Sequence, residues 1–184
     1  MTAISTNTPL IICGFPGVGK SQFATKTVTE FTADGAPIVT VPRYSLALSA
    51  PSSATVLCDS DSSTFDKAQF PDNYLSAISQ VANYHPKSIQ LVSTHNTVLA
   101  GLDSLRLPHV VVRPAMDLKD QYIQRYKDRG SPAPFCELMD TMWDRFIKDL
   151  MNHSMSSQYV LEIVLLGGEF LSSQRVVQSI FRLG

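Results

Sequence analysis

The sequence predicts a single α/β domain, with helices on both faces of a mainly parallel sheet. Short apolar runs of strand length alternate along the chain with stretches of helical periodicity, which is the pattern of such domains. Most of the short runs are rich in Val, Ile and Leu, as strands buried on both faces are. The length of 184 residues suits one domain with a sizeable core. We therefore expect one unit spanning residues 1–184.

Five strands are expected along the chain. They are the apolar runs at residues 10–13, 54–58, 89–93, 109–112 and 159–166. Each run is too short to make a good helix. Ligands of a parallel sheet bind beyond the carboxyl ends of its strands, so the residues that follow these runs are the first candidates for a site.

Helical periodicity predicts the elements between and after the strands. A helix is expected at residues 21–31, and apolar stripes predict two more at residues 74–82 and 135–150. The Met and aromatic residues of the last stripe are interpreted as core packing. Residues 172–182 are expected to form a closing helix. Residues 33–53 contain one Gly and three Pro and are expected to be an insertion, either a loop or an extra hairpin.

Composition excludes several classes of protein. A formal net charge of -1 argues against a protein whose whole surface grips duplex nucleic acid, because that binding needs many Lys and Arg. Cys13, Cys58 and Cys136 cannot all pair and form no C-x-x-C motif, so reduced thiols are expected. No stretch approaches the roughly 20 apolar residues of a membrane helix, and the N-terminus has no signal pattern. A cytoplasmic protein without membrane contact is expected, and no obligate protein partner is evident.

The most specific motif lies between the first strand and the first helix. It is Gly14-Phe15-Pro16-Gly17-Val18-Gly19-Lys20-Ser21, which matches the Walker A pattern in full. Its glycines let backbone N–H groups point at phosphate oxygens, and the helix N-terminus adds partial positive charge. Lys20 would reach the β- and γ-phosphates, while the Ser21 hydroxyl would bind Mg²⁺. The motif therefore predicts a site for ATP and Mg²⁺ formed by all eight residues.

An acidic segment follows the second expected strand. Asp59 and Asp61 come directly after residues 54–58 and would lie at the carboxyl edge of the sheet, near the transferred phosphoryl group. A carboxylate there can accept a proton from an attacking hydroxyl or bind Mg²⁺. Asp59 is the candidate metal ligand, the neighbouring Ser62 and Ser63 are candidate substrate contacts, and either aspartate can be the base. The alternative is a solvated Asp/Ser turn that caps the next helix.

A basic cluster holds five of the chain's 15 Lys and Arg residues. Its members are Arg113, Lys119, Arg125, Lys127 and Arg129. Arg125 and Arg129 are four residues apart, so they share one helix face and could close over phosphates. The breaker residues that follow predict a mobile lid at about residues 117–134. The alternative is a solvated basic helix with Asp120 and Asp128 as local partners.

The strand at residues 89–93 lacks the terminal aspartate with which motor-type and switch-type P-loop proteins hold Mg²⁺. It runs on into Thr94 and His95 instead. His95, just beyond a strand end, is a candidate substrate contact. A structural, hydrogen-bonded histidine is the alternative.

These features resemble the nucleoside, nucleotide and polynucleotide kinase group of P-loop proteins. A narrower resemblance, to small kinase-like proteins encoded by phages, rests on Asp59-Ser60-Asp61-Ser62-Ser63-x-Phe65, Asn73-Tyr74, Tyr122-Ile123-x-Arg125-Tyr126-Lys127-x-Arg129-Gly130 and Trp143-Asp144-x-Phe146-Ile147. The resemblance implies a three-layer P-loop fold with a five-stranded sheet of order 2-3-1-4-5. It also implies catalytic roles for Lys20, for Asp59 or Asp61, and for Arg125 and Arg129.

The resulting hypothesis is an enzyme, a kinase that moves the γ-phosphoryl group of ATP to a hydroxyl or phosphate acceptor. The acceptor would be carried by a nucleoside, a nucleotide or a nucleic acid. The segment at residues 33–53 is longer than the simplest kinases of the group need, so the element that contacts the acceptor is open. The alternative is a nucleotide-binding switch, or an ATPase within a larger assembly, which would bind nucleotide without any acceptor.

Overall fold

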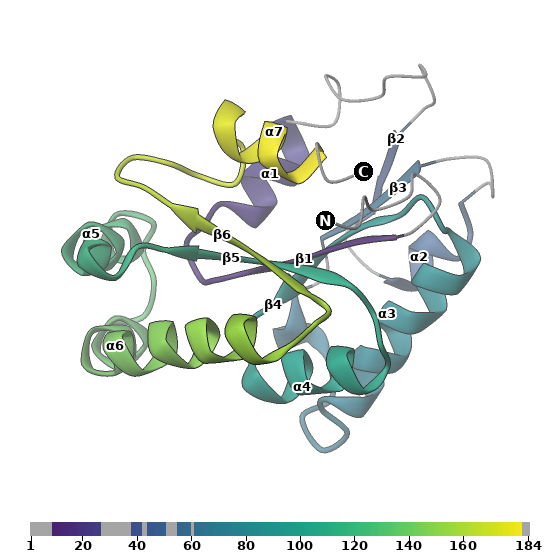
Figure 1. Ribbon diagram of the computed structural model, residues 1–184, viewed down its shortest axis with the longest axis horizontal. Helices are drawn as coiled ribbons and strands as arrows, with labels where there is room; N and C mark the ends of the chain where they lie inside the picture. The colour runs from purple at the N-terminus through teal and green to yellow at the C-terminus, as the bar shows by residue number, and fades with distance from the viewer. Residues whose placement is uncertain (1–8, 27–37, 42–43, 51–54, 60, 182–184) are drawn as a thin grey trace.

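A six-stranded parallel sheet forms the centre of the computed structural model (Figure 1). The structure describes residues 9–26, 38–41, 44–50, 55–59 and 61–181. Helices α1 (Lys20–Lys26) and α7 (Gln174–Phe181) cover one face of the sheet, while α3 (Asp72–Tyr84), α4 (Asn96–Ser104) and α6 (Ala133–Ser156) cover the other. The expected α/β architecture with helices on both faces is confirmed.

The strand order places the first strand near the middle of the sheet. The strands are β1 (Leu10–Gly14), β2 (Ile38–Val41), β3 (Thr55–Asp59), β4 (Ile89–Ser93), β5 (His109–Pro114) and β6 (Val160–Leu165). They lie in the order β2-β3-β4-β1-β5-β6, and each neighbouring pair is parallel. All strands therefore end at one edge of the sheet, where the loop after β1 and the acidic end of β3 meet.

The sheet corrects the predicted strand count and order. Five strands in the order 2-3-1-4-5 were expected, but β2 adds a sixth at the edge beside β3. This strand lies inside the segment expected to be an inserted loop or hairpin. Val39 is paired in parallel with Val56, whereas a hairpin requires antiparallel neighbours. Residues 44–50 of that segment are also described and begin with a short helix, whereas residues 33–37, 42–43 and 51–53 lie outside the described part of the chain.

The predicted helices are present with shifted bounds. The two apolar stripes form α3 and α6, and the closing helix is α7. The described part of α1 ends at Lys26, so the rest of the predicted helix lies outside the described residues. The sequence analysis did not predict α2 (Tyr44–Ala47) or α4. Helix α5 (Lys119–Asp128) directly follows a 3-10 turn and carries three of the five residues of the basic cluster, whereas Arg113 lies on β5 and Arg129 caps the end of α5.

The apolar stripe of α6, predicted to be core packing, is buried only in part: Met139 and Leu150 are buried, Phe135, Met142 and Phe146 are half-buried, and Leu138 is 51% exposed. Trp143 is 1% exposed, and its indole N–H donates to the carbonyl of Met116 at 2.8 Å. The ring of Phe15, in the loop after β1, stands edge-on to Trp143 with centroids 5.5 Å apart. The three cysteines are buried and free, and burial raises the pKa of Cys58 to about 12, so this thiol is a packing group. Packing of Phe15 on Trp143 thus ties the loop to the core.

None of the described helices combines the length and the apolar character that crossing a membrane requires.

Candidate functional site

The loop between β1 and α1 has a backbone shape that requires glycine. Gly17 has a φ of +84° and Gly19 a φ of +89°, a left-handed region that glycine enters at little cost. Space is limiting as well, because a Cβ on Gly17 would lie 2.8 Å from the Tyr126 ring. The expected strand, loop and helix therefore occur in the predicted order, with a backbone that other residues would strain.

Three distant segments hold this loop in place. The Phe15 N–H donates to the carbonyl of Val112 on β5 at 2.9 Å, and the Leu171 N–H donates to the carbonyl of Val18 at 2.8 Å. The Tyr126 hydroxyl of α5 donates to the carbonyl of Pro16 at 2.9 Å. Anchors on both sides fix the loop before any ligand binds, which lowers the entropy cost of binding.

Lys20 begins α1 and keeps most of its hydrogen-bonding capacity free. Its ammonium donates to the carbonyl of Gly14 at 2.7 Å, while an ammonium carries three donors. Burial lowers the pKa of Lys20, Asp59 and Asp61 act in the opposite direction, and Arg129 lowers it further. A partly buried cation with free donors beside another cation favours an anion in the adjacent space.

Asp59 and Asp61 differ in how their carboxylates are used. Asp61 precedes a 3-10 turn (Ser62–Thr64), and its Oδ1 accepts the N–H of Ser63 at 2.8 Å. The capping interpretation therefore describes Asp61. Asp59 ends β3, and within the described residues its carboxylate has no hydrogen bond or ion pair. A carboxylate at a strand end without a protein partner is available to a ligand.

The two arginines of the α5 segment are held by aromatic rings. The guanidinium of Arg125 lies 4.6 Å from the ring centre of Tyr122 and 4.0 Å from that of Phe170, and it donates to the Glu169 carbonyl at 3.2 Å. Arg129 lies 4.9 Å from the Tyr126 ring. Stacking restricts the rotamers of these long side chains, so less entropy is lost when they bind phosphate.

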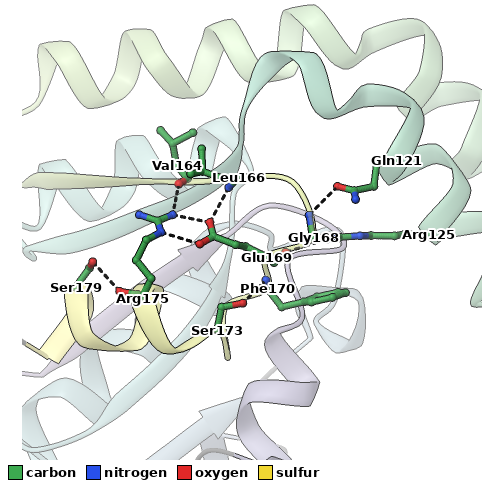
Figure 2. Close-up of polar contacts among 10 residues, drawn as sticks. All are labelled: Gln121, Arg125, Val164, Leu166, Gly168, Glu169, Phe170, Ser173, Arg175 and Ser179. Carbon is green, nitrogen blue, oxygen red and sulfur yellow. Dashed lines mark hydrogen bonds and ion pairs between the residues drawn. The ribbon is translucent and has the colours of Figure 1, made fainter.

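The turn after β6 supplies one half of this arrangement (Figure 2). Glu169 binds Arg175 through two short contacts of 2.7 and 2.5 Å, and its carboxylate also accepts the N–H of Leu166 at 2.7 Å. The Arg175 contact lowers the pKa of Glu169. Figure 2 shows Arg125 reaching from α5 toward this turn, on the side where Phe170 lies. The Glu169–Arg175 pair thus sets the position of the Phe170 backbone.

A cleft of about 970 Å³ brings these groups together. The predicted residues that line it are Pro16, Gly17, Gly19, Lys20, Ser21, Asp59, Asp61, Ser62, His95, Arg125 and Arg129. Lining residues that the sequence analysis missed are Gln22, Ser93, Asp128, Phe135 and Phe170. The turn at Gly167 and Gly168 before Phe170 was the available signal, because it marks a chain reversal at the carboxyl end of a strand.

Other predicted residues lie outside this cleft. Val18 is buried, and Ser63 is exposed but does not line the cleft. Arg113 was expected in the basic cluster, but it is buried and binds both carboxylate oxygens of Glu162, at 2.8 and 3.0 Å. Lys119 pairs with Asp140 at 2.8 Å. The basic cluster therefore divides into two residues paired within the protein, the exposed Lys127, and the two arginines at the cleft.

A smaller pocket of about 200 Å³ adjoins the cleft. Its apolar wall consists of Phe15, Phe135, Leu138, Met139, Phe146 and Leu150. Ser93, His95 and Lys20 line both spaces. His95 stands edge-on to Phe70 with centroids 5.4 Å apart, and partial burial, followed by Lys67 and Lys20, lowers its pKa. A neutral imidazole at this junction can both donate and accept a hydrogen bond.

Comparison with known proteins supports the fold. No protein-family model and no curated protein matches the sequence. Among solved structures, polyphosphate kinase 2 from Arthrobacter aurescens TC1 is similar with a TM-score of 0.51 and 8% identity, over 96% of this chain and 66% of that chain. A gluconokinase from Sinorhizobium meliloti 1021 has a TM-score of 0.48 and 13% identity, over 97% of this chain and 92% of that chain.

The comparison with solved structures concerns the fold. The chain spans just under two thirds of the length of the polyphosphate kinase 2 chain. At 8% identity, the similarity establishes a shared fold and leaves substrates and residue roles open. The narrower resemblance to small phage-type kinases stays a prediction. The chain therefore has an α/β fold of the kind found in a known kinase, with a phosphate-binding loop motif at the carboxyl edge of its sheet.

Proposed function

We propose that this protein is an ATP-dependent phosphotransferase that moves the γ-phosphoryl group to a hydroxyl or phosphate acceptor on a nucleoside, nucleotide or nucleic acid. One observation carries the proposal. A single cleft combines a glycine loop, the free donors of Lys20, two stacked arginines and the unpartnered carboxylate of Asp59. Cations for a polyphosphate and a carboxylate for an acceptor are the two requirements of phosphoryl transfer.

The loop side of the cleft suits the triphosphate of ATP. Lys20, Arg125 and Arg129 face the same space, so their charges would share the phosphate oxygens. The Ser21 hydroxyl and the Asp59 carboxylate are the oxygen donors that Mg²⁺ prefers. Both line the cleft, and an ion that they would hold there would neutralise phosphate charge.

Asp59 is the proposed base. One oxygen of the Asp59 carboxylate would suffice to bind the metal. The other would accept the proton of the acceptor hydroxyl while the hydroxyl oxygen forms its bond to the γ-phosphorus. The bond from the γ-phosphorus to the bridging oxygen breaks, and ADP leaves with that oxygen. Lys20 and the two arginines would stabilise the charge that spreads over the transferred group. Asp61, whose Oδ1 caps a turn, would position the segment that follows Asp59.

The apolar pocket is the proposed acceptor subsite. Aromatic side chains such as Phe135 and Phe146 suit a planar ring, and Ser93, His95 and Asn96 offer hydrogen bonds at one wall. The pocket shares Lys20 with the cleft, so a bound acceptor would lie beside the transferred group. Free thiols at all three cysteines suit a reducing compartment such as the cytoplasm.

The test is transfer of labelled γ-phosphate from ATP to a panel of acceptors. The panel holds nucleosides, nucleoside monophosphates, and single- and double-stranded DNA and RNA. Because one similar solved structure is a polyphosphate kinase, polyphosphate belongs in the assay as a second donor. Transfer that depends on one acceptor class and is lost in Lys20→Met supports the proposal. Tight ATP binding without transfer to any acceptor would point to the switch or ATPase alternative.

A further inference from the structure

A second cluster of titratable groups lies at the opposite edge of the sheet from the cleft. His109 is the first residue of β5, Asp103 lies in the last turn of α4, and His153 lies in the last turn of α6. The cleft is built at the carboxyl ends of the parallel strands, whereas His109 is at an amino end. The cluster is therefore separate from the proposed phosphotransferase site.

The two imidazoles face each other through their Nε2 atoms. Nε2 of His109 lies 3.1 Å from Nε2 of His153, and the rings are stacked at 27°. Nδ1 of His109 lies 2.9 Å from the carbonyl oxygen of Leu107. A carbonyl only accepts, so this Nδ1 carries the hydrogen and the neutral ring presents a lone pair at Nε2. That lone pair faces Nε2 of the second imidazole, so it can accept a hydrogen from His153 or bind a cation.

Asp103 adds an oxygen donor that is held by its own partner. Its Oδ1 accepts the hydroxyl of Ser157 at 2.6 Å, and that hydroxyl in turn accepts the N–H of Tyr159 at 3.1 Å. The other oxygen, Oδ2, lies 3.6 Å from Nδ1 of His153. The carboxylate is thus oriented from behind, with one oxygen directed at the histidine pair.

We propose that Asp103, His109 and His153 bind a divalent transition-metal ion, with Zn²⁺ as the preferred ion. Their candidate ligand atoms lie within 4.8 Å of one another. Two nitrogens that are each about 2.1 Å from one ion lie about 3.4 Å apart at the tetrahedral angle, so the 3.1 Å between the Nε2 atoms would widen by roughly 0.3 Å on binding. Two imidazoles and a carboxylate suit zinc, with water in a fourth position.

The partners of these ligands form the outer shell that such sites use. The carbonyl of Leu107 fixes the tautomer of His109, and Ser157 fixes the Asp103 carboxylate. The bound ion would join the ends of α4 and α6 to the start of β5. Its role would be to hold the helices on one face of the sheet, and no step of the proposed transfer reaction involves it.

The experiment is a metal titration of the full chain after chelator treatment and buffer exchange. Co²⁺ serves as the spectroscopic probe and Zn²⁺ as the competitor, with Mg²⁺ in excess to occupy the oxygen sites of the cleft. We expect one equivalent of Co²⁺ with the visible absorption of nitrogen coordination, displaced by one equivalent of Zn²⁺. His109→Gln and His153→Gln should each lose the Co²⁺ absorption. Ser157→Ala should weaken Co²⁺ binding about tenfold, as the loss of a hydrogen bond to a metal ligand does.

His95→Gln is the matched control, because it removes a histidine outside the cluster and should leave the titration unchanged. His153 is only partly buried, so its variant should fold even if His109→Gln does not. Zn²⁺ should also raise the melting temperature of the unmodified chain and leave that of His153→Gln unchanged. Two results would overturn the proposal. The first is the absence of a Co²⁺ spectrum with nitrogen coordination, which is expected if the two histidines share only a hydrogen. The second is a spectrum of this kind that persists in His153→Gln.

Discussion

Two groups of charges near the carboxyl edge of the sheet are used in opposite ways. On the β5–β6 side, Arg113 gives two hydrogen bonds to Glu162 and a third to the carbonyl of Pro114 at 3.1 Å. In the cleft, Lys20 makes one hydrogen bond, and Asp59 makes none within the described residues. Burying a charge is costly unless its hydrogen-bonding groups are satisfied. Satisfied charges are part of the fold, and unsatisfied charges in a cleft await a ligand.

The register of the sheet explains the satisfied pair. Arg113 is aligned with Val164 on β6, and Glu162 is aligned with Val111 on β5. The two charged residues are therefore diagonal neighbours on one face of adjacent strands, within reach of long side chains. Arg113 lies near a strand end, as Asp59 does, but its hydrogen-bond donors are used by partners within the protein. Position at a strand end alone does not make a residue functional.

The largest expected effect is that of Lys20→Met. The variant removes a cation that the proposed transition state needs, so phosphoryl transfer should fall by roughly 10³-fold. Burial lowers the pKa of Lys20, which means that the folded protein without ligand is destabilised by this charge. The melting temperature should therefore stay equal or rise. Lys127→Met, at an exposed site of α5, is the control for turnover. A stability loss in Lys20→Met would place Lys20 with the structural charges.

The two aspartates provide the next test. Asp59→Asn should lower transfer by about 10²-fold while ATP binding is kept, because an amide cannot accept the proton. Asp61→Asn should have a small effect on both, because Asn caps a helical turn as well as Asp does. Single-turnover assays and nucleotide titrations separate the two quantities. Equal losses in the two variants would contradict the assignment of the base to Asp59, and full activity in both would remove the carboxylate from the mechanism.

Substitutions in the Arg113–Glu162 pair should change the stability of the protein and not its turnover. Arg113→Met leaves Glu162 partly buried without its partner, which should cost about 3 kcal/mol of the free energy of unfolding. Activity per folded molecule should change little. The double variant Arg113→Met with Glu162→Met should recover most of the loss, because apolar replacements of both partners remove the desolvation penalty. Urea denaturation measures the effect. A double variant as unstable as the single one would show that the pair is worth more than its burial cost.

Sequence reasoning succeeded where the signal is local. The loop at Gly17 and Gly19 is specified by the backbone shape that those residues permit, and β1, β4 and β5 follow from continuous apolar runs. It failed at β2, a four-residue strand whose pairing with β3 is not encoded nearby. It also missed α4, although Val98 and Leu102 are buried four residues apart, which is a helical spacing.

The site shows the same limit. Lys20 and Asp59, which line the cleft, were expected there because a motif and a strand end mark them in the sequence. For Phe170 the turn at Gly167 and Gly168 marks only a chain reversal, and it does not indicate that Phe170 meets Arg125, 45 residues earlier in the chain. The partner of Arg113 lies 49 residues away, and nothing near Arg113 marks it as satisfied. Contacts between distant segments determine which charged side chains are left without a partner, and these contacts cannot be recognised in a single sequence.

The smallest expected effect concerns the stack of Arg125 on Phe170. Arg125→Lys keeps the charge but loses the planar group that stacks and donates in two directions, so the KM for ATP should rise about tenfold. Phe170→Leu should have a similar effect, because it removes one face of the stack. If the two residues act as a unit, the double variant should be no worse than either single one. Steady-state kinetics on the four proteins gives the coupling. Fully additive losses would mean that Arg125 contacts the nucleotide independently of Phe170.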